Sequence, residues 1–218
     1  MLAVTHPHAL PPTNHDRDAL VVVDVQPDFL PGGALAVADG DAILAPLRAL
    51  LERREFQLVV ATQDWHPRGH ISFASTHAGH KPFDVIQVHD HPQTLWPDHC
   101  VQGTPGAALH EALPLECFDT VVRKGSRVDV DSYSGFRNNW DAAGTRASTG
   151  LAEYLRERGI ESVTLCGLAR DFCVKWSAED AAAAGFRTTV LWELTRPVIP
   201  ASDVQVRADL ERAGVRIV

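Results

Sequence analysis

The chain has 218 residues, of which 45% are hydrophobic and 22% charged, a mixture typical of a globular protein that folds without disulfides or a metal. Its net charge of −8 argues against a nucleic-acid partner or an acidic membrane surface, because phosphate contacts need clustered basic residues. No apolar run reaches the roughly 18 residues of a membrane-spanning helix, and the four cysteines form no Cys-x-x-Cys pair, so we expect a cytoplasmic protein with free thiols.

The predicted elements alternate between strands and helices along the chain. Residues 1–17, rich in His and Pro, are expected to form a flexible leader before a single domain over residues 18–218. Apolar runs predict buried strands at 19–25, 58–62, 120–123, 162–168, 188–191 and 215–218. Helical patterns cover 41–54, 150–158, 171–184 and 202–213. Pro46 indicates a late or irregular start of the first helix. This alternation predicts an α/β fold with a doubly wound, mostly parallel six-stranded sheet and helices on both faces.

Side chains that can carry chemistry follow four of the predicted strands. Asp24 ends the first strand and Asp64 follows the second, while Lys124 follows the third and a turn after the fourth leads to Cys173. Because ligands bind outside the carboxyl ends of parallel strands, we expect these side chains to meet at one edge of the sheet. A single Asp after a strand is more often only a turn former, so the prediction depends on the coincidence of all four.

Cys173 has two interpretations. A free cysteine is most often a small buried hydrophobe. The predicted helix, however, places Cys173 on a face with Ser177 and beside an apolar stripe, in the first turn, where the helix dipole and a nearby Lys124 would lower the thiol pKa. Asp24 could then accept its proton. This pattern favours a nucleophile. The other cysteines are expected to serve only in packing: Cys100, Cys117 and Cys166.

Seven of the 11 His residues lie in a long irregular connection after the second strand, from Asp64 to about Gly106. The segment Asp64-Trp65-His66-Pro67-Arg68-Gly69-His70 offers one carboxylate and two imidazoles on a turn, a set that suits Zn, Fe(II) or Mn. Spacing alone selects His70 as the third ligand. The alternative is a loop whose His residues cap backbone groups. The remaining His residues are expected to be solvent-exposed: His77, His80, His89 and His91.

Six segments of the chain together carry a resemblance to a known family. They are residues 24–33 (DVQPDFLPGG), 64–67 (DWHP), 96–100 (WPDHC), 124–125 (KG), 131–136 (DSYSGF) and 167–174 (GLARDFCV). In this order they resemble the nicotinamidases, which belong to the isochorismatase-like cysteine hydrolases. The resemblance implies deamidation of nicotinamide to nicotinate and ammonia, a step of NAD salvage, and activity on pyrazinamide-like amides.

The same resemblance implies roles for individual residues. It makes Cys173 the nucleophile, Asp24 the acid and base, and Lys124 the cation between them. The backbone N–H groups of Ala169 and Cys173 would receive the oxyanion, next to a Leu168–Ala169 bond that is expected to be cis. The resemblance places Asp64, His66 and His99 on one divalent transition metal (Zn, Fe or Mn), so that His99 replaces His70 as the third ligand. It also places three aromatic side chains around the substrate ring: Phe29, Trp96 and Tyr133.

Two positions depart from the family pattern. Pro27 stands where many members carry Asn, which removes a hydrogen bond near Asp24, and Arg170 stands where many carry Thr, next to the oxyanion donors. Two other functions compete with a nicotinamidase. One is a sibling cysteine hydrolase of a carbamoyl or ureido substrate, which generally lacks the metal motif. The other is a His-rich metal-binding module, which would need neither Cys173 nor Lys124. A small-molecule partner is expected in either hydrolase, and a homo-oligomer is left open.

Overall fold

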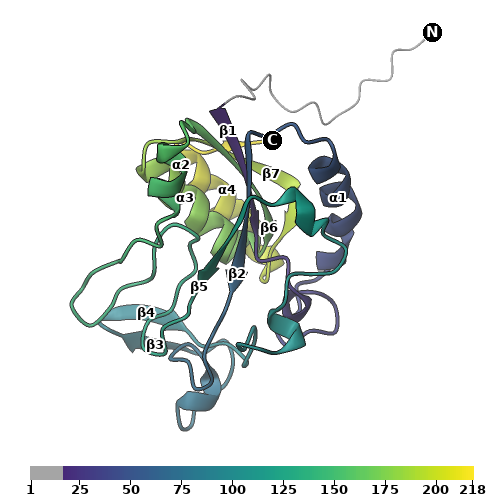
Figure 1. Ribbon diagram of the computed structural model, residues 1–218. Helices are drawn as coiled ribbons and strands as arrows, with labels where there is room; N and C mark the ends of the chain where they lie inside the picture. The colour runs from purple at the N-terminus through teal and green to yellow at the C-terminus, as the bar shows by residue number, and fades with distance from the viewer. Residues whose placement is uncertain (1–16) are drawn as a thin grey trace.

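The computed structural model describes residues 17–218, so the predicted leader lies outside the described residues except for Arg17. Six strands form one parallel sheet in the order β5-β2-β1-β6-β7-β8 (Figure 1). Their bounds are β1 Asp18–Val23, β2 Leu58–Asp64, β5 Thr120–Lys124, β6 Ser162–Leu168, β7 Arg187–Arg196 and β8 Arg216–Ile217. The chain leaves central β1 toward β2 and β5, then returns to β6 on the other side, which makes the sheet doubly wound as predicted.

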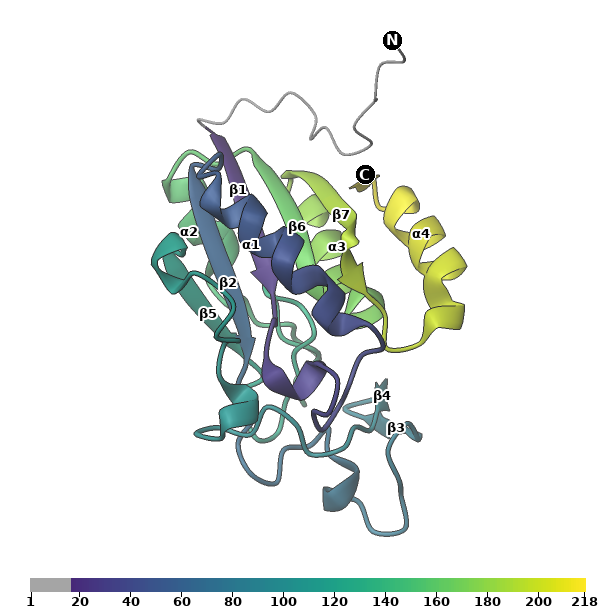
Figure 2. The same cartoon turned by 90° about the vertical axis from the view of Figure 1, so that its right-hand side faces the viewer.

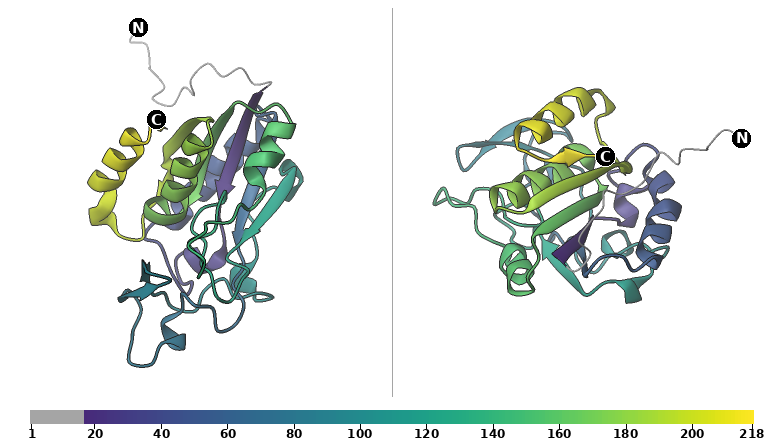
Figure 3. Two further views of the ribbon diagram at one scale, coloured as in Figure 1. Left: turned by 90° about the vertical axis from the view of Figure 1, so that its left-hand side faces the viewer. Right: turned by 90° about the horizontal axis from the view of Figure 1, so that it is seen from above.

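Helices cover both faces of this sheet (Figures 2 and 3). On one face lies α1 (Leu44–Glu52), and on the other lie α2 (Leu151–Glu157), α3 (Lys175–Ala183) and α4 (Asp203–Arg212). Each face has its own hydrophobic cluster, one including Leu47 of α1 and the other including Leu210 of α4. The predicted fold class is confirmed. Strands buried on both faces leave only the sheet's ends for chemistry.

The start of α1 explains the awkward Pro46. The chain first makes a 3₁₀ turn at Gly40–Ile43, and α1 follows, with Pro46 as its third residue. The first N–H groups of an α-helix have no partner within the helix, so a proline there costs no hydrogen bond. The predicted late start is therefore confirmed.

The connection between β2 and β5 is not wholly irregular, as the sequence had suggested. It contains an antiparallel hairpin of β3 (Val85–Val88) and β4 (His91–Thr94), visible beyond the sheet's carboxyl end in Figure 1. His89 and Asp90 form its turn with φ of 50° and 63°, the geometry of a type I′ hairpin turn. Each strand has only four residues, and the sequence of β4 (HPQT) is polar, so periodicity did not reveal the hairpin.

The prediction for the outlying His residues was wrong for three of the four. Only His80 is exposed, while His77, His89 and His91 are half-buried. His91 stacks on Trp140, with ring centroids 4.0 Å apart. The hairpin places His91 and His89 against the segment after β5, where His89 Nε2 lies 2.9 Å from the Asp129 carbonyl. His77 precedes the hairpin, and its Nε2 lies 2.7 Å from the Ile71 carbonyl.

All four cysteines are free and buried, and Cys100, Cys117 and Cys166 lie in the hydrophobic core as expected. Within residues 17–218, no helix combines the length and the apolarity that crossing a membrane requires.

Candidate active site and metal centre

Four strand ends bring the predicted side chains to one edge of the sheet. Asp24 follows β1 directly, with the left-handed φ of 47°, and Asp64 and Lys124 are paired residues at the ends of β2 and β5. Cys173 lies in a π-helical turn, Arg170–Val174, that follows β6. The sequence predicted a plain α-helix over this turn. The expected meeting of the four side chains is confirmed.

The ammonium group of Lys124 is the centre of this cluster. Its Nζ lies 2.9 Å from Asp24 Oδ2, 2.5 Å from Asp64 Oδ1 and 3.4 Å from Cys173 Sγ, and it donates to the Ser132 carbonyl at 3.0 Å. Burial alone would lower the pKa of Lys124, but the two carboxylates raise it well above its ordinary value. Lys124 therefore remains a cation in contact with the thiol.

The two carboxylates differ in their proton affinity. Burial raises the pKa of Asp24, although Lys124 opposes this shift. Burial also raises the pKa of Asp64, but the nearby Lys124 and His66 outweigh burial and hold this pKa well below its usual range. Asp24 Oδ1 accepts a hydrogen bond from Thr62 Oγ1 at 2.6 Å, and the buried Oδ2 pairs with the Lys124 ammonium at 2.9 Å. Asp24 is thus the carboxylate suited to exchange a proton.

The thiol of Cys173 does not follow the sequence expectation. Its side chain is buried, with 5% of the residue exposed, and a carboxylate oxygen of Asp24 lies within 4.8 Å of Sγ. Burial raises the pKa of Cys173 well above its ordinary value, and Lys124 only partly offsets this. The predicted lowering was wrong because the helix-dipole argument took no account of burial beside two carboxylates. The resting group is a thiol whose proton needs an acceptor.

A set of possible metal ligands lies next to this cluster: Asp64, His66 and His99. Their ligand atoms lie within 4.8 Å of one another, with Asp64 Oδ2 at 3.5 Å from His66 Nε2 and 3.8 Å from His99 Nε2. The Nδ1 atoms of the two rings lie at hydrogen-bond distance from the carbonyls of Gly125 (3.0 Å) and Pro97 (2.8 Å). This arrangement leaves both Nε2 atoms for a metal, as is usual for histidine ligands.

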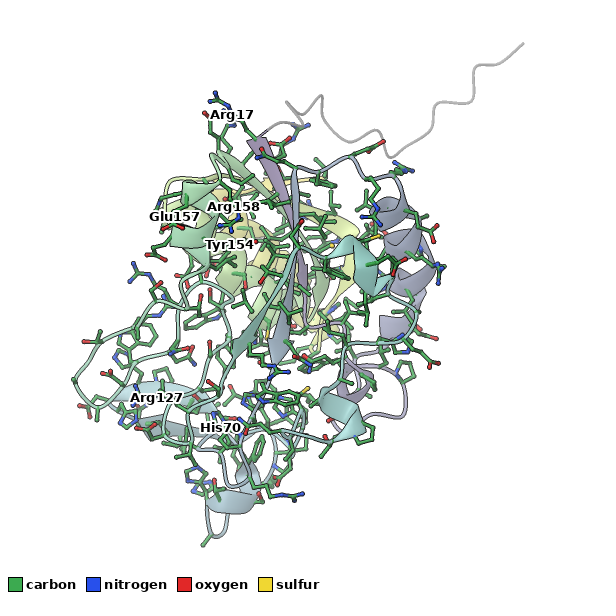
Figure 4. The ribbon with its side chains drawn as sticks, in the orientation of Figure 1. Arg17, His70, Arg127, Tyr154, Glu157 and Arg158 are labelled. Carbon is green, nitrogen blue, oxygen red and sulfur yellow. The ribbon has the colours of Figure 1, made fainter. Side chains whose placement is uncertain are left out.

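His70 lies beyond the carboxyl end of the sheet (Figure 4) and is otherwise engaged. Its Nδ1 lies 2.8 Å from Ser72 Oγ and its Nε2 lies 3.3 Å from the Val130 carbonyl. The ring packs on His66 with centroids 4.2 Å apart, and burial lowers the pKa of His70 to about 4. His70 forms a second possible metal-ligand group with His66 and Asp131, but His66 already belongs to the first group. The structure therefore favours His99, as the resemblance does, over the residue selected by spacing.

A pocket of about 320 Å³ opens onto both groups. Its wall includes the three predicted aromatic residues and Ala169, together with Cys173 and the three metal-ligand candidates. Sequence reasoning missed four further lining residues: Leu35, Asp131, Phe172 and Val198. Phe172 and Asp131 lie within the recognised segments and could have been found there. Leu35 and Val198 come from connections without a pattern, so only the tertiary structure reveals them.

Three residues that the sequence did not single out hold this site together. The Gln26 amide donates to the Asp64 carbonyl and accepts the Asp64 N–H, at 2.9 and 2.8 Å. Asp28 Oδ2 accepts the N–H of Cys100, next to His99, at 2.7 Å. Gly125 has a φ of 62°, and a Cβ there would lie 2.4 Å from the His66 ring.

The two departures from the family pattern have visible roles. Pro27 begins the 3₁₀ turn Pro27–Phe29, where its fixed φ suits the first position. The side chain of Arg170 turns away from the pocket toward β7 and α4. The Leu168–Ala169 bond is cis, as expected.

Comparisons with known proteins identify relatives of this chain. A nicotinamidase of Acinetobacter baylyi is 50% identical over 180 residues, which cover 83% of this chain and 81% of that protein. The structure of PnC1 from L. infantum in complex with nicotinate has a TM-score of 0.82 at 40% identity and covers 94% of this chain and 93% of that one. The pyrazinamidase of Pyrococcus horikoshii in complex with zinc has a TM-score of 0.74 at 34% identity, covering 93% and 98%. The family model described as the isochorismatase domain matches residues 18–196. The chain therefore belongs to the isochorismatase family.

Proposed function

We propose that this protein is a nicotinamidase, an amidohydrolase that converts nicotinamide to nicotinate and ammonia in NAD salvage and also accepts pyrazinamide-like amides. The observation that carries the proposal is the contact of Lys124 Nζ with both Asp24 and Cys173 beside a pocket that also holds Asp64, His66 and His99. The related proteins named nicotinamidase and pyrazinamidase support the substrate class.

In the first step, Asp24 accepts the proton of Cys173 while Sγ attacks the carboxamide carbon. The Asp24 carboxylate is the acceptor, because one of its oxygens lies within 4.8 Å of Sγ and burial raises the pKa of this carboxyl. Lys124 stabilises the thiolate as it forms, since its ammonium already lies 3.4 Å from Sγ. The oxygen of the amide becomes negatively charged and is received by the backbone N–H groups of Ala169 and Cys173.

In the second step, Asp24 returns the proton to the leaving nitrogen and ammonia departs. A water molecule then attacks the thioester, with Asp24 accepting its proton, and nicotinate leaves as the thiol forms again. Phe29, Trp96 and Tyr133 surround the pyridine ring in this scheme, and Phe172 contacts the edge of Trp96 with ring centroids 4.7 Å apart. A flat apolar slot of this kind favours an aromatic ring over a flexible amide.

Asp64, His66 and His99 would hold one divalent transition metal. The donor set fits, because Asp64 is kept ionised and both rings turn Nε2 to the same side. Such an ion supplies a Lewis acid that binds the pyridine nitrogen and thereby orients the ring. Zinc in a related pyrazinamidase supports this cofactor, with iron and manganese as the other candidates.

The test is ammonia release by the purified protein from nicotinamide and from an N-carbamoyl amino acid, each with and without a chelator. A nicotinamidase releases ammonia only from nicotinamide, and chelation lowers that rate. A sibling hydrolase would prefer the carbamoyl substrate, and a metal-binding module would release ammonia from neither. A cytoplasmic location and a homo-oligomeric state stay predictions, which cell fractionation and the mass in solution can check.

A further inference from the structure

Arg170, a position at which the chain departs from its family, carries a guanidinium group buried outside the pocket. Its side chain is 6% exposed. Nε donates to Thr195 Oγ1 at 2.8 Å, and Nη2 donates to the carbonyls of Trp192 at 3.1 Å and Thr195 at 2.8 Å. Nη1 pairs with Asp203 Oδ2 at 2.6 Å, and the guanidinium carbon lies 3.9 Å from the Trp192 ring. One side chain thus makes four polar contacts and one cation–π contact.

These contacts join three separate elements. Arg170 begins the turn that carries Cys173, Trp192 and Thr195 belong to the last part of β7, and Asp203 is the first residue of α4. A planar guanidinium presents its donors in a fixed fork, so several simultaneous partners define its position closely. The position of Arg170 is therefore set by β7 and α4 rather than by the turn alone.

The next residue makes a parallel connection. The carboxylate of Asp171 accepts the backbone N–H groups of Val198 and Ile199, each at 2.8 Å, and the hydroxyl of Ser202 at 3.3 Å. Val198 lines the pocket. Both residues at the start of the turn are thus fastened to the segment that runs from the end of β7 into α4.

The backbone hydrogen bonds of the turn are made to Ala169, the residue before Arg170. The carbonyl of Ala169 accepts the N–H of Phe172 at 3.2 Å and the N–H of Val174 at 3.0 Å. Cys173 lies between these two donors. Because Ala169 and Arg170 share a peptide unit, the placement of Arg170 also fixes the direction of the Ala169 carbonyl. The backbone around Cys173 depends on that direction.

We infer that Arg170 is a positioning residue for the proposed hydrolysis, which holds the turn after β6 so that the Cys173 thiol and the backbone N–H groups of Ala169 and Cys173 face one reacting carbon. It touches neither substrate nor metal. The inference rests on the proposed function. A displacement well below 1 Å at such donors is enough to lower a rate, because oxyanion stabilisation depends on donor geometry.

The experiment compares Arg170→Met with the unmodified protein and with Arg156→Met. Arg156 is a suitable control, because it also donates to a carbonyl, that of Ala184, and lies over an aromatic ring, Phe186, but on α2. Nicotinamide turnover is measured per folded molecule, with the folded fraction taken from circular dichroism. We expect kcat to fall by about tenfold to a hundredfold in Arg170→Met, with KM within about twofold, and no change in Arg156→Met.

A second readout separates positioning from stability. Pyridine-3-carbaldehyde forms a thiohemiacetal: Sγ bonds to the carbonyl carbon, the C=O π bond breaks, and the oxygen takes the electron pair and the thiol proton. This adduct presents an oxygen to the same donors as the reaction, whereas 3-methylpyridine has no oxygen to present. We expect the aldehyde affinity of Arg170→Met to fall by the same factor as kcat, within about threefold, and the 3-methylpyridine affinity to stay within about twofold.

Two milder variants keep the inference testable if Arg170→Met does not fold. Arg170→Lys retains the charge but not the fork, and Thr195→Val removes one acceptor with little change in shape. In both, kcat and aldehyde affinity should fall together by about twofold to tenfold. Unchanged kcat per folded molecule in the variants, or a loss confined to KM, would overturn the inference. If the unmodified protein releases no ammonia, the proposed function fails instead, and this result is distinguishable because it precedes any variant.

Discussion

The reacting cluster and the metal-ligand set lie on the same pocket but are held in place differently. Asp24 and Lys124 stand at the ends of β1 and β5, the two strands that flank β2 in the sheet, and the ladders of β2 fix their spacing. His99 lies instead in the long connection between β2 and β5, outside any strand of the sheet. The sheet therefore positions Asp24, Lys124 and Asp64, whereas individual polar contacts position the two histidines of the metal-ligand set.

The contacts that hold the metal-ligand set are few and specific. The rings of His66 and His99 are oriented by two carbonyls, those of Gly125 and Pro97, and the Asp28 carboxylate holds the backbone beside His99. A parallel sheet shares its restraint among many hydrogen bonds, whereas the loss of one such contact leaves a ligand free to turn. We therefore expect the metal-ligand set to be the more easily disturbed half of the site.

The largest expected effect separates the two groups. Cys173→Ala should lower ammonia release by more than about a thousandfold, because no other group can form the covalent intermediate. The metal content, measured by elemental analysis, should stay equal to that of the unmodified protein. Cys117→Ala, another buried cysteine but remote from the pocket, is the control and should remain active. Turnover by Cys173→Ala near the normal rate would refute the assigned nucleophile.

The next prediction tests which histidine belongs to the metal-ligand set. His99→Ala should weaken metal binding by at least about a hundredfold and raise KM, because one of three ligands is lost. His70→Ala should retain the metal, since both ring nitrogens of His70 face protein partners. Metal titration of both variants decides between them. Metal loss in His70→Ala with retention in His99→Ala would reverse the assignment.

A smaller effect is expected from the loss of the hydrogen bond between Asp28 and the backbone next to His99. Asp28→Asn keeps the size of the side chain but replaces a charge-assisted hydrogen bond to the Cys100 N–H by a neutral one. Metal affinity should fall by about tenfold, while the rate of thiol alkylation at Cys173 should not change. An equal loss of both properties would mean that the two halves of the site are not held independently.

The smallest effect belongs to an ion pair outside both halves. A carboxylate oxygen of Asp209, on α4, lies 2.7 Å from Lys175 Nζ. The hydrogen bond from Lys175 outweighs the effect of burial and lowers the pKa of Asp209 from 3.8 to about 2. A lowered pKa contributes stability above pH 4 that is lost as the pH falls toward 2. Asp209→Asn should therefore reduce the free energy of unfolding by about 1 kcal/mol at pH 7, and the difference should shrink severalfold by pH 2.

Denaturant unfolding at several pH values measures this difference, and nicotinamide turnover should not change. A difference that persists at pH 2 would show that the charge of Asp209 is not its cause. A loss of turnover would instead show that α4 affects the pocket through contacts other than the one between Asp203 and Arg170.

The amino-acid sequence alone was sufficient to predict the sheet and the reacting cluster. Apolar runs of strand length can be satisfied only by burial on both faces, and parallel strands necessarily bring their carboxyl ends together. Asp24, Asp64, Lys124 and the turn to Cys173 could therefore be predicted as neighbours. The motifs also supplied His99, but through resemblance to a family and not through any spacing rule.

The remaining features depend on contacts between distant segments and could not be predicted. The direction of the Cys173 pKa depends on burial beside two carboxylates, which no local pattern records. The choice of His99 over His70 depends on which ring nitrogens already have partners in distant segments. The fastening of Arg170 to β7 and α4 joins residues more than 20 positions apart. Periodicity reports which face of an element is apolar, whereas desolvation and hydrogen-bond partners across the chain exist only after the elements have packed.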